Sequence, residues 1–549
     1  MPPPGAWGSL RLGALGVAIA SAGGIAAVTL LRARPASAPR PSSDNIAYRL
    51  YALHERPFFI MVALFSMVVW LYARPSASEG EQALTPRRWQ RLQPAALWAI
   101  AAAVVLLAWI GSYVVLHSLP LSMDEYNAVF QAKIFAAGRI TAPLAPEWQP
   151  FARGLAPVFV TYYPDQQSWR SGYMPVYSAI RALFSLVGSE NLTNPLLGGL
   201  TVLVLAGACR RLWPGNNRRV ALAVVFLVTS SQFLFNSMSW YSMPAHLLFN
   251  LVWLWLYLRN DWVSLAAAPV VGVLALGLHN PFPHALFVAP FLVRMLRRRR
   301  FAWLAYMSVV YGAGSLMWFS WLRASYSYLQ VNGGMTGTFA LPRLLQLGIQ
   351  AMQLSLVLSW QAPLVGIVAV VALMRWRELG PSERDLSSGL LLTAAFYFLF
   401  PVPQGHGWGY RYIYSALGNL IILAAIGADL SAQSVGRVRV ARLVAASTLI
   451  ALLLQWPVRA VQVERFVRPF ARATEYAATL PAAVVVVYPD SSYYGRDLVR
   501  NDPFLRNSPK ILAAPLLGDS GVKRLQMTFG SHVHLIRPAE LARLGVPTF

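Results

Sequence analysis

Apolar runs of bilayer-crossing length recur through most of this chain and restrict its fold more than any other feature. A transmembrane helix needs about 20 mostly apolar residues, because the backbone must satisfy its own hydrogen bonds inside the bilayer. Thirteen candidate spans fall at 10–31, 57–73, 95–117, 196–213, 220–236, 243–258, 263–280, 282–296, 301–322, 357–374, 389–403, 412–428 and 441–456. The sequence therefore predicts an all-α polytopic membrane protein with about 11–13 transmembrane helices.

The composition agrees with this prediction. Hydrophobic residues make up 56% of the chain and charged residues 12%, and the mean hydropathy is +0.48. Such values are typical of integral membrane proteins rather than of soluble ones. The net charge of +25 is also found in nucleic-acid-binding proteins, but here the basic residues lie in short clusters between apolar runs. We therefore expect a membrane as partner and no nucleic acid.

The basic clusters also predict an orientation, because Lys and Arg are enriched in cytoplasmic loops. If the loop 118–195 lies outside, the clusters that fall inside are Arg210, Arg211, Arg218 and Arg219, then Arg294 with 297–300, then Arg375, Arg377 and Arg384, then Arg437, Arg439 and Arg442. The segment 32–56 is basic yet would lie outside, so the topology of the first span stays open. We expect a bacterial inner-membrane protein whose site faces the periplasm.

Three parts can be distinguished along the chain. Residues 1–94 form an N-terminal extension with two candidate spans, and residues 95–456 form the transmembrane domain with its external loop 118–195. Residues 457–549 are polar and mixed, with a predicted helix at 459–478 and strand-like segments at 482–488, 510–514 and 532–537. We expect a small α/β extracytoplasmic domain there.

Several classes of function lack their sequence signals. The chain contains neither a phosphate-binding GxxxxGK[ST] motif nor a dinucleotide-binding fingerprint, which counts against a nucleotide-driven engine. The single cysteine, Cys209, excludes an internal disulfide and a thiolate metal cage. No acidic residue lies inside a predicted span, whereas ion-coupled transporters usually carry an ionisable group at mid-membrane. A histidine-based relay stays open.

Two adjacent carboxylates follow the third apolar run. In "SMDEYNAVF", Asp124 and Glu125 precede apolar residues at 126, 129, 130 and 134, a spacing that predicts a helix lying on the membrane surface. Asp124 is expected at the N-cap of this helix, and Glu125 in its first turn. Helix capping alone is one interpretation of both acids. A catalytic role is the other, because histidines gather at the same side, at His117, His246, His279, His284 and His406.

A cation lies at an outer span end, where the orientation rule disfavours positive charge. Arg411 occurs in "GHGWGYRYIYS", and a guanidinium binds phosphate oxygens with two parallel hydrogen bonds. The alternative is an arginine that extends to lipid headgroups. Trp408 and Tyr410 beside it are typical of an aromatic belt, and also offer faces on which a sugar can stack.

Together, three stretches resemble the GT-C superfamily of membrane glycosyltransferases, in its protein O-mannosyltransferase and lipid A aminoarabinose transferase branch. "SMDEYNAVFQAKIFAAGRI" resembles the acidic motif that opens the first large external loop, with its juxtamembrane helix. "SGYMPVYSAIRALFSLVG" resembles the aromatic-Pro segment with a second helix, and "GWGYRYIYSALGNLIIL" a late span that begins with an arginine. The resemblance covers about residues 95–430.

The resemblance implies an inverting enzyme that moves a sugar from a polyprenyl-phosphate donor to a hydroxyl of a lipid, glycan or protein acceptor. The implied catalytic residues are Asp124 and Glu125. Candidates for binding the donor phosphate are Arg411, Lys133 and Arg170. Candidates for binding substrate are His279, His284, His406, Trp408 and Tyr410.

This chain departs from the family pattern in two places. The related aminoarabinose enzymes carry a metal-binding glutamate beside the Pro segment, where this chain has Arg170 and no acid. A divalent metal is therefore an open question, with Asp124, Asp165 and His279 as candidate ligands, and no other cofactor is expected. The acidic motif also follows the third apolar run rather than the first, which implies a two-span N-terminal extension.

Two other functions stay open on the sequence. One is a lipid or polysaccharide transporter or scaffold. A pseudo-twofold pair of broken helices around a mid-membrane cavity would favour this function. An O-antigen ligase or polymerase-like enzyme shares the lipid-linked substrate but uses a diphosphate carrier.

Overall fold

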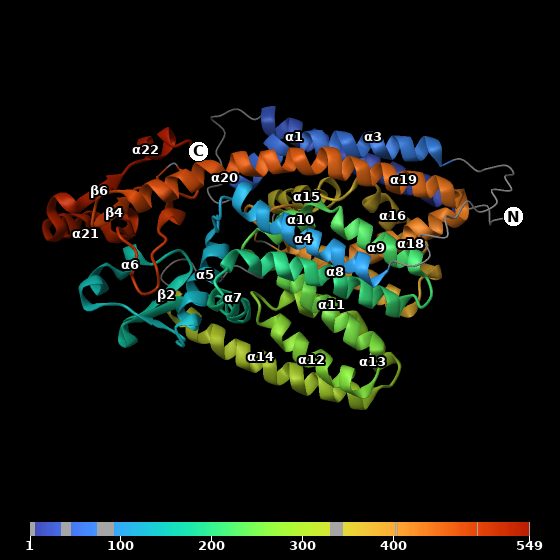
Figure 1. Cartoon of the computed structure of the whole chain (residues 1–549), viewed down its shortest axis with the longest axis horizontal. Coiled ribbons are helices and arrows are strands. Elements are labelled where there is room, and N and C mark those ends of the chain that lie inside the picture. Colours follow the sequence, from blue (N-terminus) through green and yellow to red (C-terminus); the bar gives the residue numbers. More distant parts are fainter. Residues whose placement is uncertain are drawn as a thin grey trace.

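Long helices run side by side along one axis of the molecule, with two small sheets at one end (Figure 1). The computed structural model describes residues 6–33, 45–73, 93–329, 344–400, 402, 404–490 and 492–547.

Every apolar run forms helix. The helices are α1 (Ala6–Ala33), α3 (Arg56–Tyr72), α4 (Pro94–Val114), α8 (Thr193–Leu212), α9 (Asn217–Val228) with α10 (Ser231–Met238), α11 (Met243–Arg259), α12 (Trp262–Leu276), α13 (Phe282–Arg297), α14 (Phe301–Leu329), α16 (Pro363–Met374), α17 (Pro381–Leu399), α18 (Leu417–Val435) and α19 (Arg437–Ile450). Two more helices, α2 (Asn45–His54) and α15 (Leu344–Ser359), precede α3 and α16. The predicted all-α polytopic fold is confirmed.

Fewer helices than predicted are long enough to cross a bilayer alone. Within the described ranges, five segments are long and apolar enough, namely Gly8–Ala33, Pro94–Val114, Glu190–Leu212, Arg411–Val435 and Arg437–Thr479. Two bent pairs raise this number to seven. The shorter helices explain the difference: α12 has 15 residues and a length of about 22 Å, less than the ~30 Å of the hydrocarbon core.

The bent pairs correct two expectations. The run 220–236, predicted as one span, breaks between α9 and α10 with a bend of 56°. Ser230 causes the restart, because its side chain accepts a hydrogen bond from the backbone N–H of Phe233 and caps α10. The segment 340–356, predicted as an interfacial helix, forms α15 from Leu344 onward, while residues 340–343 lie outside the described ranges. Its part from Gln346 meets α16 at 109°.

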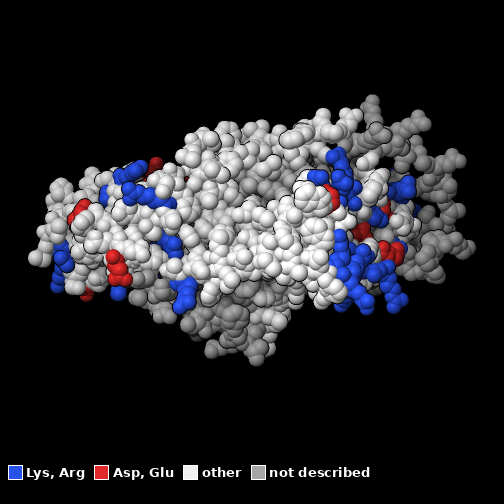
Figure 2. Space-filling view, turned by 90° about the horizontal axis from the view of Figure 1, so that it is seen from below, with Lys and Arg blue, Asp and Glu red and all other residues white. Residues whose placement is uncertain are grey.

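Charged side chains gather at the two ends of the face in Figure 2 and leave a broad band without Lys, Arg, Asp or Glu between them. Large apolar side chains are exposed on the spans, including Leu106 and Val114 on α4 and Leu316 on α14. An exposed apolar surface of this extent marks contact with lipid in a chain of this composition. The chain is therefore an integral membrane protein.

At one end, ion pairs connect the loops that the sequence placed inside. Arg294 Nε lies 2.6 Å from Asp385 Oδ2, and Arg219 Nε lies 2.8 Å from Asp429 Oδ2. Both acids lie outside the predicted apolar runs, in the parts of α17 and α18 that extend beyond those runs. Arginines neutralise them at the helix ends.

The loop between α4 and α8 folds into helices and a small sheet. The two predicted helices are α5 (Met123–Ala136) and α7 (Val176–Leu186), with a short α6 (Ala152–Leu155) between them. The strands β1 (Ala142–Pro143), β2 (Val160–Tyr163) and β3 (Ser168–Ser171) form an antiparallel sheet in the order β1-β3-β2. This sheet was not predicted from the sequence.

The C-terminal part has the predicted α/β elements. Helix α20 (Trp456–Thr479) leads to a parallel sheet in the order β5-β4-β6, made of β4 (Val484–Val487), β5 (Lys510–Ala513) and β6 (Val533–Ile536), with α21 (Ala514–Phe529) and α22 (Pro538–Arg543). The predicted strands at 482–488, 510–514 and 532–537 each contain one of these.

Helix α5 is not the surface helix that its apolar spacing predicted. Nearly all of its side chains are buried, including the polar Asn127 and Gln131. Phe130 shares one hydrophobic core with Trp169 of β3 and Leu512 of β5. The C-terminal sheet and the external loop therefore cover α5 on both faces, which the periodicity of α5 alone does not reveal.

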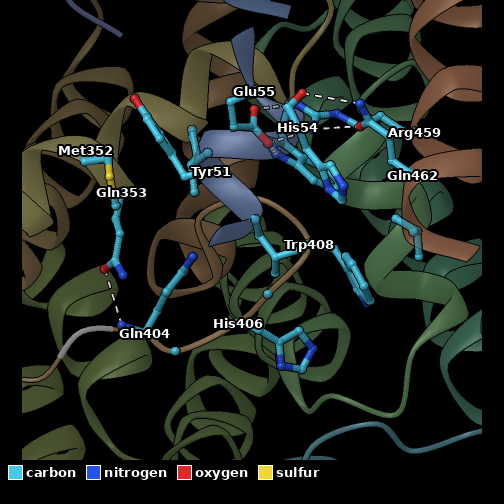
Figure 3. A pocket seen from close by; sticks show the side chains of 16 residues that line it. Tyr51, His54, Glu55, Met352, Gln353, Gln404, His406, Trp408, Arg459 and Gln462 are labelled. Carbon is cyan, nitrogen blue, oxygen red and sulfur yellow. Dashed lines mark hydrogen bonds and ion pairs between the residues drawn. The ribbon is translucent and has the colours of Figure 1, made fainter. Parts of the chain in front are cut away.

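The N-terminal extension is anchored by a buried ion pair. Glu55 accepts hydrogen bonds of 2.6 Å from both terminal nitrogens of Arg459, whose side chain is 1% exposed. Ser359 Oγ and Trp360 Nε1 also donate to Glu55. The pair and His406 lie on opposite sides of a small polar pocket (Figure 3). His406 belongs to the loop before η7 (Arg411–Ala416). Glu55 thus joins the extension to α20 and to the turn between α15 and α16.

Removal of one partner of this pair is expected to be costly, because it leaves an uncompensated buried charge. Arg459→Ala should destabilise the fold by about 3–5 kcal/mol. Arg468→Ala on the same helix is the matched control, since Arg468 is 47% exposed and pairs with Glu464 at the surface. This control should cost much less, because exposed ion pairs contribute little to stability. Thermal unfolding of the purified protein in detergent measures both, and equal losses would contradict the assigned role of Glu55.

Candidate active site

An ion pair joins the two residues that the sequence singled out. Arg411 Nη1 donates to Asp124 Oδ2 at 2.6 Å, although 287 residues separate them in the chain. Their side chains are 13% and 17% exposed. The hydroxyl of Tyr173 donates to the other carboxylate oxygen of Asp124. Since Tyr173 belongs to "SGYMPVY", all three stretches that resemble the GT-C family meet at this point.

The start of α5 sets the direction of Asp124. Ser122 is the N-cap, not Asp124 as predicted, and it forms a capping box with Glu125. Glu125 Oε2 accepts from the Ser122 N–H at 3.0 Å, and Glu125 Oε1 accepts from the Trp240 N–H at 3.1 Å. Ser122 closes the helix end, so the side chain of Asp124 is left to meet Arg411 and Tyr173.

The two adjacent acids differ in their ionisation. Burial raises the pKa of Asp124, but the nearby charges of Arg411 and His279 and the hydrogen bonds from Tyr173 and Arg411 outweigh it, and its pKa is about 2. Burial raises the pKa of Glu125 to about 7, against the opposing hydrogen bonds from Ser122 and Trp240. Asp124 is therefore a carboxylate at neutral pH, whereas Glu125 is close to half-protonated.

Two of the predicted histidines lie at the ion pair. The ring of His279 packs against Tyr173, with ring centroids 4.5 Å apart. His406 Nε2 lies 3.2 Å from the hydroxyl of Tyr241, and its Nδ1 lies 2.8 Å from the hydroxyl of Tyr494. The guanidinium of Arg411 lies 5.3 Å from the centre of the Tyr241 ring. Aromatic hydroxyls and imidazoles thus line the surroundings of the pair.

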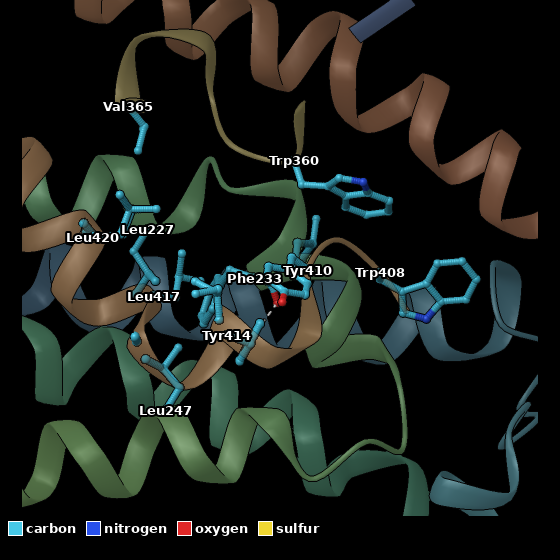
Figure 4. Close-up of a cluster of buried hydrophobic side chains, with 14 of the residues drawn as sticks. Leu227, Phe233, Leu247, Trp360, Val365, Trp408, Tyr410, Tyr414, Leu417 and Leu420 are labelled. Carbon is cyan, nitrogen blue, oxygen red and sulfur yellow. Dashed lines mark hydrogen bonds between the residues drawn. The ribbon is translucent and has the colours of Figure 1, made fainter. Parts of the chain in front are cut away.

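Other predicted substrate-binding residues belong to the protein core. His284 bonds to Asn250 and Tyr311 between helices. Tyr410 is fully buried, and its hydroxyl donates to Gln350. Figure 4 places Tyr410 and Trp408 among the buried side chains around Phe233. We interpret His284, Trp408 and Tyr410 as packing residues, because apolar neighbours and internal hydrogen bonds account for them.

The two further phosphate-binding candidates are engaged elsewhere. Lys133 lies 3.3 Å from Asp502 in the C-terminal part, about 13 Å along α5 from Asp124. Arg170 on β3 is buried, donates to the hydroxyls of Tyr163 and Ser325, and lies over the ring of Trp321. Neither of these basic residues contributes to the Asp124–Arg411 pair.

The candidate metal ligands do not converge. Asp165 is exposed on the turn between β2 and β3, whereas Asp124 and His279 lie at the ion pair. Within the described ranges of the chain, no three His, Cys, Asp or Glu side chains come together as a metal ion requires. Metal dependence stays a prediction from the resemblance.

Three tyrosines near the ion pair, Tyr173, Tyr241 and Tyr494, were not predicted from the sequence. Tyr173 lies inside the motif "SGYMPVY", so the sequence could have revealed it. Tyr241 follows the α9–α10 break, and Tyr494 lies in the C-terminal part, where the sequence carries no motif. Only the fold brings them to His406.

The raised pKa of Glu125 makes a pH-dependent contribution to stability. The folded pKa of about 7 exceeds the ordinary value of 4.5, so the folded state holds this proton more tightly. The contribution of this proton to the unfolding free energy is fully present below about pH 4.5 and is lost as the pH rises to about 7. The unfolding free energy of the wild type, relative to Glu125→Gln, should therefore fall by a few kcal/mol over this interval. Denaturant titrations at several pH values measure it.

Glu147→Gln, on the exposed part of the same external loop, is the matched control for this titration. A wild-type profile that runs parallel to that of Glu125→Gln would show that Glu125 does not hold the proton.

Solved structures of ArnT from Cupriavidus metallidurans have the same fold. With undecaprenyl phosphate bound, that structure matches with a TM-score of 0.52 at 15% identity, over 82% of this chain and 91% of that chain. In the apo state the TM-score is 0.51 at 15% identity, over 81% and 90%. No protein-family model and no curated protein matches the chain. The chain is thus an integral membrane protein that shares its fold with these ArnT structures.

Proposed function

We propose that the chain is an inverting glycosyltransferase that transfers a sugar from a polyprenyl phosphate to an acceptor hydroxyl on the periplasmic side of the membrane. The observation that carries this proposal is the ion pair of Asp124 and Arg411, formed where the three motifs meet. An ArnT structure of the same fold is bound to undecaprenyl phosphate, which supports a donor of this class.

Each partner of the pair has a distinct role in this reaction. The acceptor oxygen forms a bond to the anomeric carbon while the bond from that carbon to the phosphate oxygen breaks. The carboxylate of Asp124 accepts the hydroxyl proton as the new bond forms. The guanidinium of Arg411 stabilises the negative charge that grows on the leaving phosphate. The lipid tail of the donor stays in the bilayer throughout.

The pair implies an exchange of partners when the donor binds. In the free protein Asp124 and Arg411 neutralise each other. A phosphate that takes over Arg411 withdraws a charge that lowers the pKa of Asp124, and burial raises this pKa, so it rises from about 2 when the donor binds. Asp124 then becomes a stronger base at the moment it is needed. Among the described residues, the buried Nε of Arg411 has no hydrogen-bond partner, so we expect it to be available to the phosphate.

Loss of the base should abolish most of the transfer. Asp124→Asn keeps the size and a hydrogen-bond acceptor but cannot take the proton, so the rate of sugar transfer should fall by about 10²–10⁴-fold. Transfer from a radiolabelled polyprenyl-phosphate sugar to extracted envelope acceptors, with purified protein in lipid nanodiscs, measures it. Glu147→Gln serves as control. Full activity of Asp124→Asn would refute the base assignment.

The exchange of partners predicts opposite effects on donor binding. Asp124→Asn frees Arg411 and removes a repelling charge, so undecaprenyl phosphate should bind about tenfold more tightly, which corresponds to ~1.4 kcal/mol. Arg411→Gln should weaken binding by at least the same factor. Titration of both variants with undecaprenyl phosphate in nanodiscs measures these changes. Weaker binding to Asp124→Asn would mean that Arg411 does not receive the phosphate.

A further inference from the structure

A short segment of the C-terminal part contacts both chain regions that form the Asp124–Arg411 pair. Arg500 donates to the backbone carbonyls of Pro120 and Leu121, at 2.6 and 2.8 Å. These residues immediately precede the N-cap of α5. Tyr494, six residues before Arg500, bonds through its hydroxyl to His406 Nδ1 at 2.8 Å. His406 lies in the loop that ends at Arg411.

A third contact reaches the end of α5 itself. The carboxyl of Asp497 lies beside the backbone N–H of Met123, the first residue of α5. Burial raises the pKa of this carboxyl to about 7, and the Met123 N–H acts in the opposite direction. The first N–H groups of a helix have no partner within the helix, and a carboxylate near them is stabilised by the helix dipole. Asp497 therefore completes, from another part of the chain, the capping that Ser122 and Glu125 begin.

The three contacts reach the two chain segments that carry the ion pair. Asp497 and Arg500 hold the residues before and at the start of α5, and so fix Asp124. Tyr494 holds His406, and so fixes the loop that carries Arg411. All three are contributed by one turn, η9 (Gly495–Leu498), and its neighbours. A displacement of this segment moves the base relative to the cation.

We propose that Tyr494, Asp497 and Arg500 form an interdomain clamp that positions Asp124 against Arg411. This inference rests on the function proposed above. The clamp residues are positioning residues: they act through the backbone of α5 and through His406. Alignment of reacting groups is sensitive, since a misplacement of about 1 Å can reduce a rate about 10²-fold.

The two sides of the clamp should affect different kinetic constants. Asp497→Ala loosens α5 and should lower kcat at least about tenfold, with the donor KM changed less than about threefold. Tyr494→Phe removes the hydroxyl from His406, loosens the loop of Arg411 and should mainly raise the donor KM. Asp497→Asn should restore most of kcat, because its amide oxygen can take the same place beside the Met123 N–H. Asp519→Asn, on the exposed surface of α21, is the matched control.

Amide hydrogen exchange tests the clamp without any assay of activity. Asp497→Ala should speed exchange at residues 123–126, while exchange at the opposite end of α5 and in β4 stays as in the wild type. Asp497→Asn and Asp519→Asn should show the wild-type pattern. These measurements use the full-length protein in nanodiscs.

The outcomes separate the clamp from the proposed function. Unchanged exchange in Asp497→Ala, or an equal loss of kcat in Asp497→Ala and Asp519→Asn, overturns the clamp. Faster exchange at residues 123–126 together with a selective loss of kcat supports it. A wild-type protein that transfers no sugar, but whose Asp497→Ala variant shows faster exchange, overturns the proposed function and leaves the structural contact in place.

Discussion

The contact between Asp124 and Arg411 is the interaction on which the rest of the site depends. A carboxylate and a guanidinium that are largely removed from water are each costly to bury alone, and they are stable here because they face each other. Tyr173 satisfies the second carboxylate oxygen. The same arrangement keeps one anion and one cation together at a place where an anionic lipid phosphate can exchange with the carboxylate.

The N-terminal helices and the C-terminal part both support the elements that hold this pair in place. Glu55 and Arg459 connect the N-terminal helices to α20, which leads to the C-terminal sheet. That sheet packs on α5, and the segment around Asp497 touches the first residue of α5. The N-terminal extension and the C-terminal part therefore both contribute to the site, because each contacts an element that carries or supports it.

Most of the fold could be predicted from the sequence, because long apolar runs identify membrane helices from local composition alone. The sequence also predicted that Asp124 and Arg411 belong together, since both interrupt apolar sequence at the same side. It failed where long-range packing decides. The apolar spacing of α5 indicated a surface helix, whereas Phe130 is buried against Trp169 of the external loop and Leu512 of the C-terminal sheet. The N-cap was assigned to Asp124 rather than Ser122. The sequence also does not reveal that His284 bonds to Asn250 and Tyr410 to Gln350, and their role in substrate binding stays a prediction.

A structure of the protein with a polyprenyl phosphate bound in a lipid nanodisc tests the central claim most directly. The account predicts that the phosphate oxygens lie within hydrogen-bond distance of the Arg411 guanidinium, and that Asp124 has released Arg411 and faces the acceptor side of the site. A phosphate bound elsewhere, with the Asp124–Arg411 pair intact, would contradict it.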